Sequence, residues 1–252
     1  MAISIDLTGK NALVTGGTRG IGRAISRRLA SAGASVGMLY RGDSKSAEAT
    51  VLELSGMSAA GVFAGAADLA DRGQAETAAR MALEHFGGEI DIVVLNAGIG
   101  TRGAPFADLS FDEWRRPFDV NLDGHVALLQ TLYPAMRPGG SVIFISSGAG
   151  HDPLENLSAY GASKAAVNHL ATVLAQEWGP RGIRVNIISP GSTAKEPIDY
   201  ENLTDSQKQT VAATALRRIG TAEDIADVTL FYASDLSSFV TGQWLRVNGG
   251  RV

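Results

Sequence analysis

Short apolar runs alternate with longer helical patterns from one end of the chain to the other. The apolar runs are continuous rather than alternating, which is typical of strands covered on both faces of a sheet. The segments between them repeat apolar residues at the spacing of one helix face. Strands that alternate with helices favour right-handed crossovers and a parallel sheet. We therefore predict an α/β fold, a doubly wound parallel sheet of about seven strands with helices on both faces.

The pattern also gives approximate boundaries. Asp71 and Ser110 are suited to begin helices, and Gly33 is suited to follow the end of one. The chain shows no linker-like change in composition, so we expect a single domain over residues 1–252. The predicted strands are 11–15, 35–40, 61–66, 90–95, 141–146, 184–188 and 244–247, and the predicted helices are 20–32, 44–55, 71–86, 110–136, 158–178 and 222–233.

Composition narrows the possible functions. The net charge of −4 argues against nucleic acid as a partner, and the absence of cysteine excludes disulfides and thiolate catalysis. The four histidines have no metal-binding spacing, so we expect no metal site. No apolar run approaches the ~18 residues of a membrane span, and the first residues do not resemble a signal peptide. We expect a cytoplasmic protein without a membrane partner.

Residues 15–22, TGGTRGIG, lie between a predicted strand and a predicted helix. Glycines allow a tight turn and a close approach to a pyrophosphate, and the following helix presents its first N–H groups to that charge. The sequence therefore predicts a Rossmann-like dinucleotide site, although a plain glycine-rich turn has the same pattern. The candidate cofactor contacts in this turn are Gly16, Thr18, Arg19, Gly20, Ile21 and Gly22.

Ligands of such sheets bind beyond the carboxyl ends of the strands, where small or polar residues follow each predicted strand here. Tyr160 and Lys164 are four residues apart on a predicted helix, and hence on one face. A neighbouring ammonium favours the phenolate, so we expect Lys164 to lower the pKa of Tyr160 and to make it a proton donor or acceptor. Ser147 ends a strand and could hydrogen-bond a carbonyl oxygen. Each feature alone could equally be a surface helix pair or a turn serine.

Together these motifs resemble the short-chain dehydrogenase/reductase family, and the resemblance covers nearly the whole chain. The tail from Arg218 to Gly250 also looks like this family. The motifs that carry the resemblance are the glycine turn, Asn96-Ala97-Gly98, Asn121, Ser147, Tyr160-x-x-x-Lys164 and Pro190-Gly191.

The resemblance implies four catalytic residues. Tyr160 would be the general acid in reduction, Lys164 would hold the nicotinamide ribose, and Ser147 would polarise the substrate carbonyl. Ser147 rather than Ser146 is chosen because it lies thirteen residues before Tyr160. Asn121 would hold a water that links Lys164 to solvent, a role compatible with an asparagine that kinks a helix.

The end of the second predicted strand bears on the choice of dinucleotide. NAD-binding members carry a carboxylate there, whereas this chain has Tyr40 and Arg41. Asp43 is better placed to start the next helix. Guanidinium groups of Arg19 and Arg41 suit a 2′-phosphate, so we expect NADPH, with NADH less favoured.

Further cofactor contacts follow from the resemblance. Two positions depart from the family pattern, because Lys195 stands where many members have threonine and Leu95 where many have asparagine. Thr193 is a possible substitute for the missing threonine. The remaining expected cofactor contacts are Tyr40, Arg41, Asp68, Leu69, Asn96, Ala97, Gly98, Tyr160, Lys164, Pro190 and Gly191.

Within the family, the chain most resembles the 3-oxoacyl-[acyl-carrier-protein] reductases and related ketoreductases. We expect NADPH-dependent reduction of a ketone, either a 3-oxoacyl thioester or a small carbonyl compound. Secondary alcohol or sugar oxidation by the same family is the alternative, and a non-catalytic dinucleotide-binding scaffold is a third. Arg102, Arg137 and Arg181 are the available contacts for acidic acyl-carrier protein.

Two expectations concern the larger structure. We expect residues 193–216 to form a substrate lid, and the family implies a homotetramer. The candidate substrate walls are Ala149, Gly150, His151, Leu154 and Leu157.

Overall fold

The computed structural model describes residues 4–57, 61–101, 103–194 and 197–251. Within them seven strands form one sheet in the order β3-β2-β1-β4-β5-β6-β7, and every neighbouring pair is parallel. The direction of strand succession reverses between β1 and β4, which confirms the doubly wound topology. The strands are β1 (Asn11–Thr15), β2 (Ser35–Tyr40), β3 (Val62–Ala66), β4 (Ile90–Leu95), β5 (Met136–Ile145), β6 (Arg184–Pro190) and β7 (Trp244–Val247).

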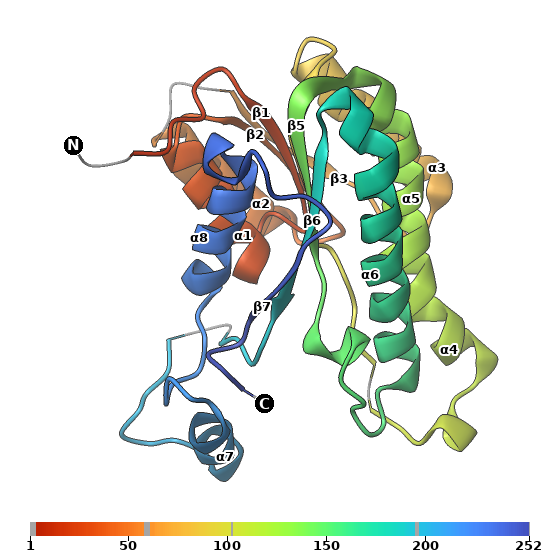
Figure 1. Cartoon of the computed structure of the whole chain (residues 1–252), viewed down its shortest axis with the longest axis vertical. Helices are drawn as coiled ribbons and strands as arrows, with labels where there is room; N and C mark the ends of the chain where they lie inside the picture. The colour runs from red at the N-terminus through yellow and green to blue at the C-terminus, as the bar shows by residue number, and fades with distance from the viewer. Residues whose placement is uncertain (1–3, 58–60, 102, 195–196, 252) are drawn as a thin grey trace.

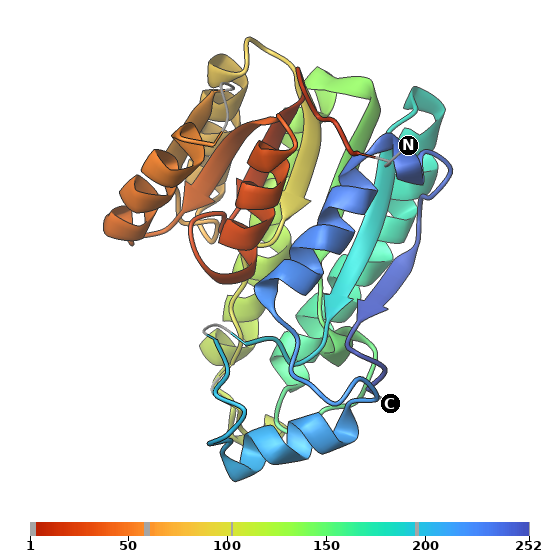
Figure 2. The same ribbon diagram turned by 90° about the vertical axis from the view of Figure 1, so that its left-hand side faces the viewer.

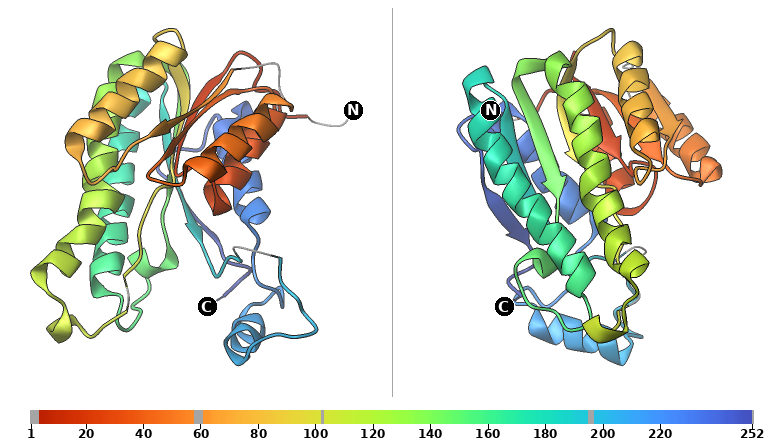
Figure 3. Two further views of the ribbon diagram at one scale, coloured as in Figure 1. Left: turned by 180° about the vertical axis from the view of Figure 1, so that it is seen from behind. Right: turned by 90° about the vertical axis from the view of Figure 1, so that its right-hand side faces the viewer.

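Helices cover both faces of this sheet (Figure 1). The face seen in Figure 2 carries α1 (Gly20–Ser31), α2 (Ser44–Ser55) and α8 (Ala222–Ala233). The opposite face, seen in the right-hand view of Figure 3, carries the other large helices, whereas α7 (Asp205–Ala213) lies beyond the carboxyl ends of the strands. The helices of that opposite face are α3 (Arg72–His85), α4 (Phe111–Phe118), α5 (Gly124–Leu132) and α6 (Ser158–Trp178).

The core is divided by the sheet into two clusters. In β4, Ile92 and Val94 pack into the cluster under α1 and α8, whereas Val93 and Leu95 pack into the cluster under α5 and α6. All four side chains are at most 2% exposed. Because successive strand residues face opposite sides, a strand with helices on both sides is apolar at every position.

The predicted helix over residues 110–136 is wrong as a single element. The structure has α4, then a π-helical turn at Asp119–Asp123, α5 and a short 3₁₀ turn at Tyr133–Ala135. Pro117 lies inside α4 and has no N–H to donate to the preceding turn, and the helical register changes immediately after it. Met136 already belongs to β5, where it pairs with Ile90.

Other boundaries agree within a few residues, and the predicted caps are confirmed. The Asp71 side chain accepts a hydrogen bond from the Gln74 N–H at 3.0 Å, and Ser110 forms a capping box with Glu113. Helix α7 was not predicted, because its sequence is polar and has no buried face. It begins instead with a capping box between Thr204 and Gln207.

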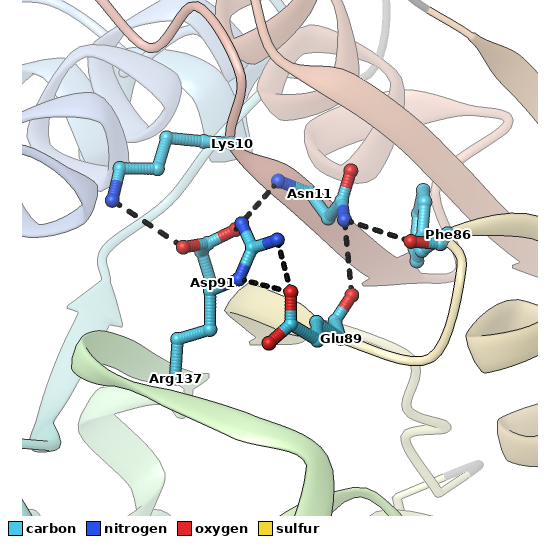
Figure 4. A network of polar contacts seen from close by, with 6 residues as sticks. All are labelled: Lys10, Asn11, Phe86, Glu89, Asp91 and Arg137. Carbon is cyan, nitrogen blue, oxygen red and sulfur yellow. Dashed lines mark hydrogen bonds and ion pairs between the residues drawn. The ribbon is translucent and has the colours of Figure 1, made fainter.

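A polar network joins the amino ends of the central strands (Figure 4). The Asp91 carboxylate is 3% exposed and accepts hydrogen bonds from the Asn11 N–H at 2.9 Å and Arg137 Nη1 at 3.2 Å. Lys10 Nζ lies 3.3 Å from the same carboxylate. Arg137 also pairs with the exposed Glu89. One buried charge of β4 is thereby satisfied by groups from β1, from β5 and from Lys10 just before β1.

Among the helices of the described segments, none is both long enough and apolar enough to cross a membrane.

Candidate active site

A cleft of about 280 Å³ lies at the carboxyl ends of the strands, next to the β1–β4 reversal. This is the edge at which open parallel sheets bind ligands. Its lining brings together nine of the residues predicted from sequence. They are Ile21, Asn96, Gly98, Ser147, Tyr160, Lys164, Pro190, Gly191 and Thr193.

The glycine turn after β1 is as tight as its sequence indicates. A Cβ atom at Gly22 would lie 2.0 Å from the Gly16 carbonyl oxygen, so no other residue fits there. Gly16 and Gly20 adopt φ angles of 64° and 51°, the left-handed region that favours glycine. Helix α1 follows without any side-chain cap on its first turn, which leaves its N–H groups available. Thr18 is buried in this turn, and its carbonyl accepts a hydrogen bond from Thr50.

The segment after β4 braces this turn. The Asn96 side chain donates to the carbonyl oxygens of Thr15 at 3.0 Å and Gly16 at 3.2 Å. The backbone N–H groups of Asn96 and Ala97 donate to Thr15 Oγ1 at 3.0 and 2.9 Å. A Cβ at Gly98 would lie 3.1 Å from Asn121 Oδ1 and 3.5 Å from Lys164 Nζ. The three predicted residues therefore connect the glycine turn with the catalytic candidates.

Tyr160 and Ser147 face each other across the cleft. Tyr160 lies in the first turn of α6, and Ser147 follows β5 and caps a short turn through the Ala149 N–H at 3.2 Å. Burial raises the pKa of the Tyr160 phenol, and a hydrogen bond with Ser147 opposes that rise. The phenol is therefore held in its protonated form at neutral pH.

Lys164 is 4% exposed, and its Nζ donates to the Ile145 carbonyl at 2.9 Å. Burial lowers its pKa to about 8. The ammonium lies 6.0 Å from the centroid of the Tyr160 ring, so the predicted shared face is confirmed. The predicted direction of the Tyr160 pKa is wrong, because desolvation of the phenol is the largest influence on it and acts upward.

Asn121 is completely buried in the π-helical turn between α4 and α5. Its Oδ1 accepts from the Ile99 N–H at 2.8 Å, and its Nδ2 donates to the Ile99 carbonyl at 3.1 Å and Ser163 Oγ at 3.0 Å. Ser163 Oγ in turn donates to the Tyr160 carbonyl at 2.8 Å. The irregular helix thus places Asn121 against the helix that carries Tyr160 and Lys164.

The expected adenosine side lies at the ends of β2 and β3. Arg41 is exposed directly after Tyr40. Hydrogen bonds from Ser46 are the largest cause of the lowered pKa of Asp43, and the charge of Arg19 contributes to it, so Arg19 lies near the same loop. Asp43 is a helix cap, since it accepts from the Ser46 N–H at 3.0 Å and Ser46 Oγ at 2.7 Å.

Two further residues of this side follow β3. Asp68 accepts from the Ala70 N–H at 3.0 Å and lies 3.6 Å from Arg116. Leu69 is buried, and its carbonyl packs so closely on α5 that a Cβ at Gly124 would lie 2.0 Å from it.

The segment after β6 closes the far side of the cleft. The Gly191 N–H donates to the Val247 carbonyl at 3.0 Å, and Thr193 Oγ1 donates to the Gly191 carbonyl at 3.1 Å. Lys195, the departure from the family pattern, lies outside the described residues, as does Arg102.

Several lining residues were not predicted. Ile99 and Gly100 extend the wall beyond Gly98, and Ile145 and Ser146 form the floor next to Ser147. Their position directly beside predicted motifs is the only sequence signal that could have found them.

The residues predicted to form the substrate walls lie in different surroundings. Ala149, Leu154 and Leu157 line a second hollow of about 550 Å³ on the loop between Ser147 and α6. His151 instead stacks on Trp244 of β7, with ring centroids 3.0 Å apart. Gly150 packs closely on Asn168 of α6.

Comparison with known proteins agrees with this geometry. A family model described as enoyl-(acyl carrier protein) reductase matches residues 16–251. The chain belongs to the short-chain dehydrogenase/reductase family. It is thereby an oxidoreductase that acts on CH–OH or carbonyl groups.

Relatives in this family carry different names. The 3-oxoacyl-[acyl-carrier-protein] reductase FabG of Staphylococcus aureus is 37% identical over 96% of this chain and 97% of its own length. The sorbose reductase of Schizosaccharomyces pombe is 35% identical, with 99% and 98% covered. The 3beta-hydroxysteroid dehydrogenase 1 of Eggerthella lenta is 37% identical, with 97% and 94% covered.

Two solved structures share the fold closely. A short-chain dehydrogenase from Burkholderia cenocepacia in complex with NADP has a TM-score of 0.90 at 34% identity, with 97% of this chain and 98% of that chain covered. A blue fluorescent protein from a metagenomic library in complex with NADPH has the same TM-score and identity, with 98% and 99% covered.

Proposed function

We propose that the protein reduces a ketone, a 3-oxoacyl-type or small carbonyl substrate, to a secondary alcohol with NADPH as hydride source and Tyr160 as proton donor. The observation that carries the proposal is the convergence of Ser147, Tyr160 and Lys164 on the cleft that also contains Ile21 of the glycine turn.

The residues at the glycine turn fit a dinucleotide. Helix α1 has an uncapped amino end and no acidic residue in its first turn, which suits a pyrophosphate. A Cβ at Gly20 would meet no atom within 4 Å, so the turn borders open space. Solved relatives at 34% identity bind NADP or NADPH, which supports NADPH for this chain. Arg19 and Arg41 would hold the 2′-phosphate, and Asp68 and Leu69 would contact the adenine side.

The cleft residues can carry out the proton part of the reaction. The bound nicotinamide supplies a hydride to the carbonyl carbon. Ser147 Oγ accepts from the Ala149 N–H, and its own proton is available to polarise the carbonyl oxygen. Tyr160 then transfers its phenolic proton to that oxygen. Lys164 would hold the nicotinamide ribose, and Asn121 would keep the helix that carries Lys164 in position.

The protonated state of Tyr160 is compatible with the proposed reduction. A proton donor must be protonated before the step, and burial raises the pKa of this phenol. The alternative, oxidation of a secondary alcohol or sugar, needs the phenolate. Turnover with NADPH and ketone, compared with NADP⁺ and alcohol at the same pH, decides between the two directions.

Arg137 and Arg181, the two expected contacts of acyl-carrier protein that the structure describes, give no support to an acyl-carrier protein as substrate carrier. Arg137 lies at the start of β5 and pairs with Glu89 and Asp91. Arg181 donates to the carbonyl oxygens of Tyr133 and Met136 near the same end of the sheet. Both are remote from the cleft, so free ketones and short thioesters are the first substrates to test.

Residues 193–216 remain our proposed substrate lid. Thr193 pairs in an isolated parallel bridge with Gly220, which follows the segment, so the chain returns to the edge of the cleft after it. Helix α7 lies between these two residues in the chain, below the sheet in Figure 1.

We also propose the homotetramer that the family implies. Phe239 and Leu245, near and on the edge strand β7, are exposed apolar side chains that support association. The molar mass in light scattering tests it.

The central test is the substitution Tyr160→Phe. It removes the proton donor and keeps the ring, so kcat for ketone reduction should fall about 100-fold or more. The NADPH dissociation constant, measured by fluorescence titration, should change by less than about threefold, because Tyr160 would be only one of many contacts to the dinucleotide. Steady-state kinetics over a panel of ketones measures the first quantity.

Tyr133→Phe is the matched control, since it makes the same change in a ring that stacks on Trp178, away from the cleft. It should leave kcat unchanged. Equal turnover by wild type and Tyr160→Phe would overturn the assignment of Tyr160. Tight NADPH binding with no turnover of any ketone would favour the non-catalytic scaffold.

A further inference from the structure

A buried histidine lies behind the cleft, in the first turn of α5. His125 is 2% exposed. Its Nδ1 lies 3.1 Å from the carbonyl oxygen of Asn121, one helical turn earlier. Its Nε2 lies 3.2 Å from Oγ1 of Thr15, the last residue of β1. The ring therefore spans the space between the π-helical turn and the strand that leads into the glycine turn.

The proton positions on this ring follow from its neighbours. A carbonyl oxygen only accepts, so Nδ1 must carry the proton that is donated to Asn121. Thr15 Oγ1 already accepts from the N–H groups of Asn96 and Ala97, which leaves its own hydroxyl proton to donate. The His125 Nε2 is the nearer acceptor, since the Val94 carbonyl lies at 3.5 Å. The ring is the neutral Nδ1–H tautomer, with both nitrogens satisfied.

Electrostatics keep the ring neutral. The pKa of His125 is lowered to about 3. Burial is the largest cause, and the charge of Lys164 is the second. A neutral ring cannot pass a proton onward without a partner that is able to receive it. The two contacts of His125 are a carbonyl and a hydroxyl that is already fully hydrogen-bonded. The histidine therefore holds its neighbours in position and does not transfer a proton.

Each end of the ring connects to a different half of the site. At the Nδ1 end, Asn121 binds the Ile99 backbone and Ser163, and Ser163 binds the Tyr160 carbonyl. At the Nε2 end, Thr15 binds the N–H groups of the segment after β4, whose Asn96 side chain holds the glycine turn.

We propose that His125 is a positioning residue that couples the two halves of the site. Its Nδ1–H fixes the Asn121 backbone and hence the geometry around Tyr160 and Lys164. Its Nε2 fixes the Thr15 hydroxyl and hence the turn that receives the dinucleotide. The catalytic half of this proposal rests on the proposed function, whereas the cofactor half requires only that the dinucleotide binds.

Two amide substitutions test the catalytic half and the cofactor half of the proposal separately. In His125→Asn the side-chain nitrogen occupies the place of Nδ1, and it can still donate to Asn121 but cannot reach Thr15. In His125→Gln the amide reaches toward Thr15 but leaves Asn121 without its donor. His125→Leu removes both contacts and keeps a buried apolar side chain. One lost hydrogen bond corresponds to a change of up to about tenfold.

The measurements are kcat for ketone reduction and the NADPH dissociation constant, both taken well below the melting temperature of each variant. We expect kcat to fall about tenfold in His125→Gln and His125→Leu but to be largely retained in His125→Asn. We expect the dissociation constant to rise about tenfold in His125→Asn and His125→Leu but to be largely retained in His125→Gln. This crossed pattern is the signature of two separate contacts.

A packing defect alone would not produce that pattern. Leu128→Ala, in the same helix and also fully buried, is the control. It should lower the melting temperature without changing kcat or the dissociation constant. If the three His125 variants lose both quantities together, or lose neither, His125 is a packing residue and the proposal is wrong. If the wild type turns over no ketone, the proposed function fails, but the dissociation constants still test the cofactor half.

Discussion

At the scale of single residues, our proposal assigns the choice of cofactor to the charge that follows Tyr40. Arg41 is exposed, and the only nearby carboxylate in the loop, Asp43, is occupied as a helix cap. A 2′-phosphate would therefore meet guanidinium groups, whereas the ribose of NADH would find no free carboxylate in this loop.

Arg41→Asp should reverse this preference. The new carboxylate repels a 2′-phosphate and can accept hydrogen bonds from ribose hydroxyls. We expect the ratio of kcat/KM for NADPH to that for NADH to fall about 100-fold, because the loss of the guanidinium and the gain of the carboxylate act in the same direction and both are partly screened. Arg80→Asp makes the same charge change on α3 and should leave the ratio unaltered. A ratio unchanged by Arg41→Asp would remove Arg41 from the cofactor site.

Sequence predicted which residues meet at the cleft better than it predicted their protonation. The spacing of Tyr160 and Lys164 placed them on one helix face, which the structure confirms. Spacing carries no information about burial, however, and burial determines the direction of the Tyr160 pKa. His125 was considered only as a metal ligand, because its partner Thr15 is 110 residues away in the chain.

At the scale of elements, the strand–turn–helix unit formed by β1, the glycine turn and α1 depends on one very close contact. A methyl group at Gly22 would lie 2.0 Å from the Gly16 carbonyl and 2.6 Å from the Asn96 side chain. The first of these is a backbone atom, so relief requires the turn itself to move.

Gly22→Ala should therefore abolish dinucleotide binding while the rest of the fold persists. We expect the NADPH dissociation constant in a fluorescence titration to rise about 100-fold or more, and the melting temperature to fall by several degrees. Gly179→Ala is the control, since its Cβ meets no atom within 4 Å and its φ of −51° suits alanine. Unchanged affinity in Gly22→Ala would mean that the turn does not receive the pyrophosphate.

Elements with a strong apolar period were predictable, and those shaped by local exceptions were not. The central strands were found because both of their faces are buried, whereas the edge strands β3 and β7 are partly exposed and were found from their short apolar runs. The segment 110–136 has helical periodicity throughout, yet Pro117 and the π-helical turn that contains Asn121 interrupt it. Helix α7 has no apolar face, so only its capping box indicates it.

At the scale of the whole molecule, the two ends of the sheet carry different tasks. The carboxyl ends hold the cleft and its irregular turns. The amino ends hold buried charges, among them Asp91 in Figure 4 and Arg184, which donates to the Tyr232 and Ser234 carbonyls and to Ser237 Oγ. Strands several residues long separate the two ends, so a change at one should not reach the other.

Asp91→Ala tests this separation. It leaves the Asn11 N–H and part of the Arg137 guanidinium without their acceptor in a site that is almost closed to water, and it removes the link between β1, β4 and β5. The free energy of unfolding in urea should fall by about 3 kcal/mol. Glu89→Gln, which removes a charge from the exposed partner of the same arginine, should cost less than about 1 kcal/mol.

Function should be insensitive to the same substitution. Because Asp91 lies at the opposite end of β4 from Asn96, the geometry of the cleft does not depend on it once the chain is folded. We expect kcat and the NADPH dissociation constant of Asp91→Ala to match those of the wild type at temperatures where both are fully folded. We expect no transmission between the two ends, because the polar groups at each end of the sheet are satisfied by separate partners. A loss of turnover without a loss of stability would contradict this and would show that the strands transmit changes from one end of the sheet to the other.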